Sequence, residues 1–280
     1  MRFTALLALA LFLLVGCQSE ETNTLPSGYE YTMHVDEPGE PVSPNMVAYL
    51  QYQMRSDDST IFDSREQPTP QAIQVPDTNT LGRALSFLEE ALMLMSVGDS
   101  MTITIPLDTL PNKPPEFQNS DFAYYDIKLV DAKSKDALQA QAGEIGSYVN
   151  EVIGKYLAGT LENIQETEEG LKYVVHEEGT GAMPSDGDIV FAHYYGALTD
   201  STMFDNSFRR GNPFAFPLNQ GSVIQGWDIG FAQLKQGAKA TFFIPSELGY
   251  GATGSPPTIP GGAELVFYVE LVAVADNPNL

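Results

Sequence analysis

The residues of this chain that could carry chemistry are aromatic rather than ionisable. Its 280 residues include three scattered histidines, His34, His176 and His193, and one cysteine, Cys17. Nowhere do His, Cys, Asp and Glu residues come together at the spacing of a metal site, or of a nucleophile with its base. Aromatic residues instead gather near turns towards the C-terminus. A concave aromatic pocket supports binding, or a reaction that needs only desolvation and conformational strain, with no metal and no cofactor.

A glycine motif near the C-terminus imitates a nucleotide-binding loop. Residues Gly249–Gly254 match the pattern G-x-G-x-x-G letter for letter. That pattern binds a dinucleotide only where a helix begins at its third glycine and holds the pyrophosphate at the helix N-terminus. Pro256, Pro257 and Pro260 follow and prevent such a helix. We therefore expect no dinucleotide here.

Short segments at regular spacing in the C-terminal part of the chain carry a family resemblance. They are Val190–Gly196, Phe204–Asp205, Pro213–Phe216, Val223–Trp227, Gly249–Gly251, Ile259–Pro260 and Leu265–Phe267. In order and spacing these segments resemble the FKBP family of peptidyl-prolyl cis/trans isomerases, over a region from about Thr167 to Ala275. The resemblance implies a five-stranded antiparallel sheet wrapped around a short helix, with the pocket between helix and sheet.

The resemblance also assigns roles to individual residues. It implies that Trp227 forms the pocket floor and that Asp205 orients the rim. The Tyr250 hydroxyl and the backbone N–H of Ile259 would donate hydrogen bonds to carbonyl groups of the substrate. The expected catalytic residues are Tyr194, Asp205, Trp227, Tyr250 and Phe267. The expected substrate-binding residues are Phe204, Phe214, Val223, Ile224 and Ile259.

An aromatic pocket suits the isomerisation of a proline peptide bond on physical grounds as well. Rotation about a peptide bond faces a barrier of about 18–20 kcal/mol because amide resonance is lost, and uncatalysed X-Pro exchange takes roughly tens to hundreds of seconds. A twisted amide has lost the charge separation of the planar form, so an apolar pocket favours the twisted amide. We therefore expect an isomerase acting on proline-containing unfolded or exported polypeptides. The resemblance adds macrolides as expected inhibitors.

Apolar runs separated by Gly, Pro, Asn and Asp predict the strands that position these residues. The runs are Leu171–Val175, Ile189–Tyr195, Ala240–Ile244 and Leu265–Val274. Trp227, Phe231 and Leu234 recur at helical spacing, which predicts a short helix over Gly226–Leu234. We place the catalytic FKBP-type domain at residues 166–276.

The N-terminal half repeats part of this pattern. Val47–Ser64 aligns without a gap on Ile189–Asn206, so that Phe62-Asp63 falls on Phe204-Asp205. This alignment predicts a degenerate FKBP-like domain at residues 40–131. An unrelated β-rich spacer is the alternative.

The pocket residues are mostly replaced in this copy. Leu88 stands in the place of Trp227, and Phe87 stands in the place of the glycine before it. Residues 110–115 replace the Gly-Tyr-Gly turn. We therefore expect little isomerase activity from the N-terminal domain.

A heptad-like stripe marks residues 132–165 as a helical linker. The stripe consists of Leu138, Ala142, Ile145, Val149, Val152 and Tyr156. We expect this helix to pack against the chain's own domains, and a coiled-coil homodimer is the alternative. The complete prediction is an α+β fold of two FKBP-like domains joined by a helical linker.

The first residues predict export and lipid attachment. Arg2 precedes the apolar run Ala5–Val15, which is too short to cross about 30 Å of hydrocarbon as a helix. The run leads into Leu14-Val15-Gly16-Cys17, which resembles the lipobox of bacterial lipoproteins, where the cysteine receives the lipid. We expect a lipoprotein signal peptide at residues 1–17 and a flexible acidic tether at residues 18–39. A plain secretory signal with an incidental cysteine is the alternative.

Charge and location narrow the function further. Fourteen Lys and Arg against 37 Asp and Glu give a net charge of −23, which repels nucleic acid and excludes it as a partner. Gln18 after the cysteine favours the outer membrane, by resemblance to known sorting rules. A lipid anchor would hold the protein there on the periplasmic or cell-surface side. A non-catalytic tethered chaperone or partner-binding protein remains the alternative function, because a pure foldase does not need the degenerate copy.

Overall fold

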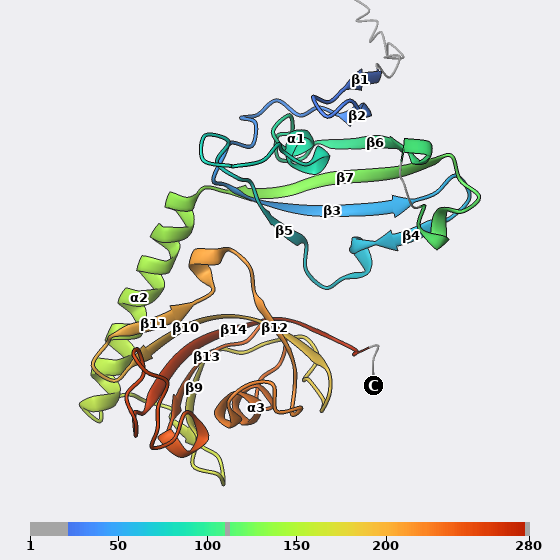
Figure 1. Cartoon of the computed structure of the whole chain (residues 1–280). Helices are drawn as coiled ribbons and strands as arrows, with labels where there is room; N and C mark the ends of the chain where they lie inside the picture. The colour runs from blue at the N-terminus through green and yellow to red at the C-terminus, as the bar shows by residue number, and fades with distance from the viewer. Residues whose placement is uncertain (1–21, 110–112, 278–280) are drawn as a thin grey trace, which may run out of the picture.

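The computed structural model describes residues 22–109 and 113–277, which form two antiparallel sheets joined by one long helix (Figure 1). The predicted signal peptide at residues 1–17, with Cys17, lies outside the described residues. Residues 110–112, which belong to the segment that replaces the Gly-Tyr-Gly turn, also lie outside them. None of the helices in the described ranges combines the length and the apolar character that crossing a bilayer requires.

The N-terminal sheet wraps around the short helix α1 (Phe87–Leu92). The side chain of Ser86 accepts from the N–H of Glu89, while the Glu89 carboxylate accepts from the N–H of Ser86, so two N–H groups at the helix start are satisfied. The strands follow the order β1-β2-β6-β7-β3-β4, with β5 beside β3. Their bounds are β1 Thr22–Thr24, β2 Glu30–Val35, β3 Val47–Arg55, β4 Thr60–Asp63, β5 Gln71–Gln74, β6 Ser100–Pro106 and β7 Phe122–Lys133.

The C-terminal sheet wraps in the same way around α3 (Gln225–Phe231). Its strands follow the order β11-β10-β14-β13-β9-β8, with β12 beside β10. Their bounds are β8 Gln165–Glu166, β9 Lys172–Glu177, β10 Ile189–Leu198, β11 Met203–Asn206, β12 Phe214–Pro217, β13 Lys239–Ile244 and β14 Leu265–Ala275. Short 3-10 helices follow several strands, at η1 Ser64–Glu66, η2 Leu107–Thr109, η3 Pro115–Phe117, η4 Phe208–Arg210 and η5 Ser246–Leu248.

The predicted α+β fold with two sheet domains is confirmed, but each sheet has seven hydrogen-bonded strands instead of five. The difference lies at the edges. The two short strands β4 and β5 share one side of β3, and β1 adds a short outermost strand. The C-terminal sheet is extended in the same way by β11, β12 and β8.

Helix α2 (Lys135–Leu157) lies within the predicted linker and packs against the C-terminal sheet (Figure 1). Ser134 caps its start by accepting from the N–H of Ala137 at 3.1 Å. Successive strand residues face opposite sides of a sheet, so Phe242 packs with α3 while Phe243 packs with α2. The predicted packing against the chain's own domain is confirmed, and most of the heptad stripe is buried in that contact.

The two sheets share their irregularities as well as their strand order. Strands β3 and β10 each shift register twice, at corresponding positions. His34 in β2 and His176 in β9 each occupy a bulge. Each His Nε2 contacts a threonine hydroxyl on the neighbouring strand, Thr102 at 2.7 Å and Thr241 at 2.8 Å.

The predicted flexible tether at residues 18–39 is wrong from Thr22 onward. Strands β1 and β2 lie in this range, and β2 pairs along β6. The acidic composition concealed an alternation in which Tyr31 and Met33 pack on the core of the N-terminal domain. That domain therefore begins before residue 40.

Candidate active site

A pocket of about 300 Å³ opens between α3 and the C-terminal sheet. Strands β10, β11, β12 and β14 contribute side chains to it, together with α3 and the loops on either side. Nine of the ten predicted site residues line the pocket, and Ser222 joins them. These nine are Tyr194, Phe204, Asp205, Phe214, Val223, Ile224, Trp227, Tyr250 and Phe267.

Trp227 is the buried centre of this aromatic assembly, with 5% of its surface exposed. Its ring meets those of Tyr194 at 5.1 Å, Phe267 at 5.2 Å and Phe214 at 5.9 Å, each edge to face. Gly226 before it allows α3 to approach β13, because a Cβ at this position would lie 2.5 Å from Ile244. The floor is thus closely packed and made of aromatic rings.

One wall of the pocket is polar. The Tyr194 hydroxyl donates to Oδ2 of Asp205. Arg210 donates to Oδ1 of Asp205 at 2.7 Å and to the Tyr194 hydroxyl at 2.6 Å. Each of the three side chains therefore holds the other two in place.

The ionisation of this wall follows from the same contacts. Burial, and then the hydrogen bond to Asp205, raise the pKa of Tyr194 to about 12. Burial alone would raise the pKa of Asp205, but the hydrogen bonds from Tyr194 and Arg210 together hold that pKa below its ordinary value. Tyr194 is therefore neutral and Asp205 charged at neutral pH.

Arg210 was missed by the sequence reasoning. It lies in η4, outside the segments that carry the resemblance. The signal that could have found it is the pair Arg209-Arg210, two cations in a strongly acidic chain, soon after Asp205.

The rim of the pocket is exposed. Phe214 and Tyr250 each have 41% of their surface open to solvent. Tyr250 belongs to a turn that follows η5, where the N–H of Gly251 donates to the carbonyl oxygen of Ser246 at 2.7 Å. The Tyr250 side chain can therefore meet a substrate that enters from solvent.

Ile259 does not play the predicted role. Its N–H donates to the carbonyl oxygen of Ser255 at 3.0 Å, and its side chain is buried in the core beside the pocket. The prediction overlooked that a tight loop pairs its own backbone groups. The N–H of Ile224 is the better candidate, because Ile224 lines the pocket, caps α3, and has no acceptor for its N–H among the described residues.

At the corresponding place in the N-terminal domain, aromatic side chains pack against one another. Phe87 packs edge-on against Tyr125 at 5.0 Å and against Tyr29 at 5.8 Å. Asp63, which aligns with Asp205, is paired with Arg65. The aromatic rings here contact one another where the C-terminal domain has its pocket.

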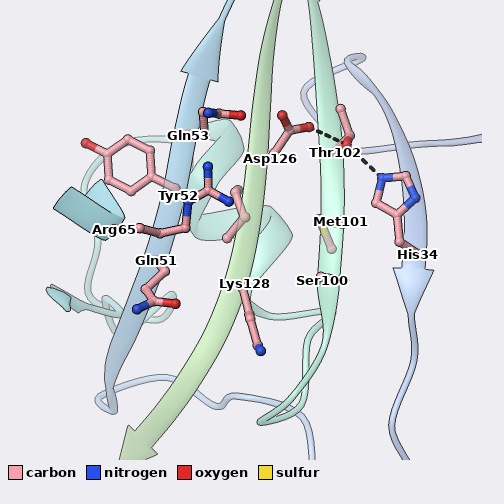
Figure 2. A pocket seen from close by; sticks show the side chains of 11 residues that line it. His34, Gln51, Tyr52, Gln53, Arg65, Ser100, Met101, Thr102, Asp126 and Lys128 are labelled. Carbon is pink, nitrogen blue, oxygen red and sulfur yellow. Dashed lines mark hydrogen bonds between the residues drawn. The ribbon is translucent and has the colours of Figure 1, made fainter. Parts of the chain in front are cut away.

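A different hollow, of about 360 Å³, lies on the outer face of the N-terminal sheet (Figure 2). His34, Thr102 and Asp126 form a hydrogen-bonded chain across β2, β6 and β7, and Arg55 extends it by donating to Asp126 at 2.7 Å. The same face of the C-terminal sheet is apolar and covered by α2. The polar character of this face explains why α2 packs on the C-terminal sheet.

Comparison with known proteins assigns the region that contains the pocket to a family. The family of FKBP-type peptidyl-prolyl cis-trans isomerases matches residues 181–272. An FKBP-type peptidyl-prolyl cis-trans isomerase FkpA from Aeromonas hydrophila is 45% identical over 159 residues, which cover 55% of this chain and 58% of that protein. Peptidyl-prolyl cis-trans isomerase FKBP2 from Mus musculus is 52% identical over 94 residues, 34% of this chain and 67% of that protein.

Two further similar proteins are a plant relative and a solved bacterial structure. Peptidyl-prolyl cis-trans isomerase FKBP15-2 from Arabidopsis thaliana is 55% identical over 92 residues, 33% of this chain and 56% of that protein. The crystal structure of FkpA from Escherichia coli is 37% identical, with a TM-score of 0.41, and the match covers 51% of this chain and 65% of that one. The chain thus spans somewhat over half the length of the Aeromonas and Arabidopsis relatives, and two thirds of the Mus musculus protein. This chain belongs to the FKBP-type peptidyl-prolyl cis-trans isomerase family.

Proposed function

We propose that this protein is a peptidyl-prolyl cis-trans isomerase and that the pocket around Trp227 is its active site. The observation that carries the proposal is the juxtaposition of a buried aromatic floor with one hydrogen-bonded polar wall, Tyr194 with Asp205 and Arg210. Family membership supports the same activity.

The pocket would accelerate exchange by differential binding. A proline ring seated on Trp227 leaves water, and the twisted amide loses less solvation there than the planar amide does. The Tyr250 hydroxyl at the rim and the N–H of Ile224 would hold the flanking carbonyl groups. Asp205 and Arg210 neutralise each other, so the wall presents no net charge to the amide. The reaction proceeds without a covalent intermediate.

The test is the cis-to-trans rate of a short X-Pro peptide with the chain from residue 18 onward. The parent protein should accelerate exchange and a macrolide should abolish the acceleration. Tyr250→Phe should lower kcat/KM several-fold, and Trp227→Leu should lower it by about tenfold or more, since tenfold corresponds to roughly 1.4 kcal/mol of transition-state stabilisation. Tyr148→Phe, an exposed tyrosine on α2 outside the pocket, is the matched control and should leave the rate unchanged.

A parent protein that does not accelerate X-Pro exchange would refute the proposed isomerase function. If it still bound unfolded chains, the alternative of a tethered chaperone would stand.

We infer that the N-terminal domain is a degenerate copy of the same fold. Its matching strand order and bulges support this inference, and the packing of Phe87 on Tyr125 supports the loss of its pocket. The full chain carrying Trp227→Leu keeps only what is left of the weakened C-terminal pocket, together with any activity of the N-terminal domain. Its exchange rate should lie about tenfold or more below that of the parent, and turnover close to the parent rate would show a second active site.

The substrates and the location are part of the proposal. A lipid on Cys17 would hold the protein at the outer membrane, on the periplasmic or cell-surface side, where it would act on exported polypeptides during folding. Cys17→Ser should move the protein from the membrane fraction to the soluble fraction and abolish palmitate labelling. Unchanged membrane association would contradict the lipid anchor.

A further inference from the structure

We infer that the groove between the two domains is a binding surface for the extended polypeptide that flanks the substrate proline. This inference rests on the proposed function, because it takes the pocket around Trp227 as one end of the surface. The groove has a volume of about 360 Å³. Its lining comes from both domains and includes Val47, Ala72, Gln74, Arg210, Asn212 and Phe214.

The groove is continuous with the pocket. Phe214 lines both of them, and it is exposed at the rim. Arg210 lies in the groove and donates to Tyr194 and Asp205 in the pocket wall. A polypeptide that leaves the pocket over Phe214 therefore enters the groove directly.

A hydrogen bond joins the two sides of the groove. The Tyr49 hydroxyl in β3 donates to the carbonyl oxygen of Gly211 at 2.6 Å, and Leu138 of α2 lies next to the same glycine. Burial, and then Asp131, raise the pKa of Tyr49 to about 12, so this donor keeps its proton at neutral pH. A preformed groove loses less conformational entropy on binding than one that must close.

Two strands that contribute side chains to the groove, β5 and β12, lie at sheet edges. Within the described residues, β5 pairs with β3 alone and β12 pairs with β10 alone. Such an edge presents unpaired N–H and C=O groups that an extended peptide can bond as an added strand. Figure 1 shows β5 on the side of the N-terminal sheet that lies towards the segment leading into β12. Ala72 and Gln74 are two residues apart in β5, so both side chains face the groove.

The chemistry of the lining selects the occupant. Among the described lining residues only Arg210 is charged, and Asp205 already pairs with it. Gln74 and Asn212 offer amide donors and acceptors, while Val47 and Phe214 offer apolar surface. An extended segment with uncharged side chains matches this surface, whereas a strongly charged segment finds no partner in it.

The test compares a short X-Pro peptide with one that carries about six uncharged residues on each side of the same X-Pro pair, about 20 Å of extended chain per side. The parent should show a higher kcat/KM for the long peptide. Ala72→Tyr fills the groove with a side chain that strands tolerate, and it should lower the long-to-short ratio about fivefold while leaving the short peptide unaffected. Ala84→Tyr makes the same change at an exposed position outside the groove, and it should keep the parent ratio.

An unchanged ratio in Ala72→Tyr, or an equal loss for both peptides, would overturn the inference. If the parent fails on the short peptide, the proposed isomerase function fails instead. The groove is then judged by the Kd of the long peptide, which should be weakened by Ala72→Tyr and not by Ala84→Tyr. Another outcome is that the parent self-associates, with Ala72→Tyr abolishing the self-association and leaving peptide binding unchanged. That result would assign the groove to a second copy of the chain and refute the inference.

Discussion

The hydroxyl of Tyr49 in the N-terminal sheet donates to the carbonyl oxygen of Gly211 in the C-terminal domain, at 2.6 Å. Gly211 follows η4 with a φ of +69°, a conformation that favours glycine. A Cβ at this position would lie 2.6 Å from the Tyr49 oxygen and 3.1 Å from Leu138. The backbone conformation and the domain contact thus both require glycine here.

Gly211→Ala should therefore lower the free energy of unfolding by roughly 2–4 kcal/mol, because it adds a clash to the backbone strain. Urea denaturation of the parent and the variant measures this loss of stability. Gly221→Ala is the matched control, since Gly221 has a φ of +67° with open space around it. That substitution should cost only the strain, roughly 1 kcal/mol. Equal losses at the two positions would show that the domain contact contributes nothing.

Arg210→Met should lower kcat/KM for a short X-Pro peptide by roughly threefold to tenfold. The variant keeps the apolar length of the side chain and removes the hydrogen bonds to Asp205 and Tyr194, each worth about 0.5–1.5 kcal/mol for a neutral partner and more for a charged one. Isomerase kinetics measure the effect. Arg209→Met removes the neighbouring cation outside the pocket and should leave kcat/KM unchanged. The same loss in both variants would point to net charge instead of the pocket wall.

The sequence could predict those parts of the site that come from short, local patterns. Trp227 and Phe231 at helical spacing define α3, and the alternation in β10 and β14 places Tyr194 and Phe267 on the inner face. Interactions between distant segments were not predictable in this way. Arg210 acts through a fold-dependent contact with Tyr194, and Ile259 loses its expected role to a pairing with Ser255 across a loop.

In the N-terminal domain, the features that the sequence did not predict were missed for a related reason. Strand β2 was hidden because the stretch around it, residues 18–39, contains acidic residues and no Lys or Arg, and only its pairing with β6 reveals it as a strand. The contact of Tyr49 with Gly211 joins two domains, and neither residue carries a motif. Local patterns thus predict the elements, while the domain interface becomes visible only in three dimensions.

His193 should make stability depend on pH. Burial, and then Lys133 and Arg210, lower its pKa from 6.5 to about 4 in the folded protein. Between these two values the unfolded chain binds more protons, so stability rises with pH. The contribution of neutral His193 to the free energy of unfolding is complete above about pH 6.5. It is lost as the pH falls towards 4, and the total loss is about 3 kcal/mol.

Urea denaturation at several pH values checks this prediction with His193→Gln, which retains a polar group near Ser207. The variant should lose most of the slope between pH 4 and 6.5. An unchanged slope would assign the dependence to other groups.

The glycines of α2 should respond in opposite directions to alanine. Gly143 has open space where a Cβ would lie, whereas a Cβ at Gly146 would lie 2.8 Å from the hydroxyl oxygen of Tyr195 in β10. Gly143→Ala should therefore raise the free energy of unfolding by roughly 0.5–1 kcal/mol through helix propensity alone. Gly146→Ala gains the same propensity but must displace Tyr195, so it should be neutral or destabilising by roughly 1–2 kcal/mol.

Thermal or urea denaturation of the two single variants shows whether packing on the sheet or helix propensity determines the effect of each alanine on stability. Adding Tyr195→Phe, which removes the hydroxyl that the new methyl group would meet, should restore part of the propensity gain to Gly146→Ala. When Tyr195→Phe is combined with Gly143→Ala, the two effects on the free energy of unfolding should add, because residue 143 does not contact the sheet. Equal stabilisation by Gly143→Ala and Gly146→Ala would mean that α2 does not rest on the outer face of the C-terminal sheet in solution, and its stripe would then be open to a second copy.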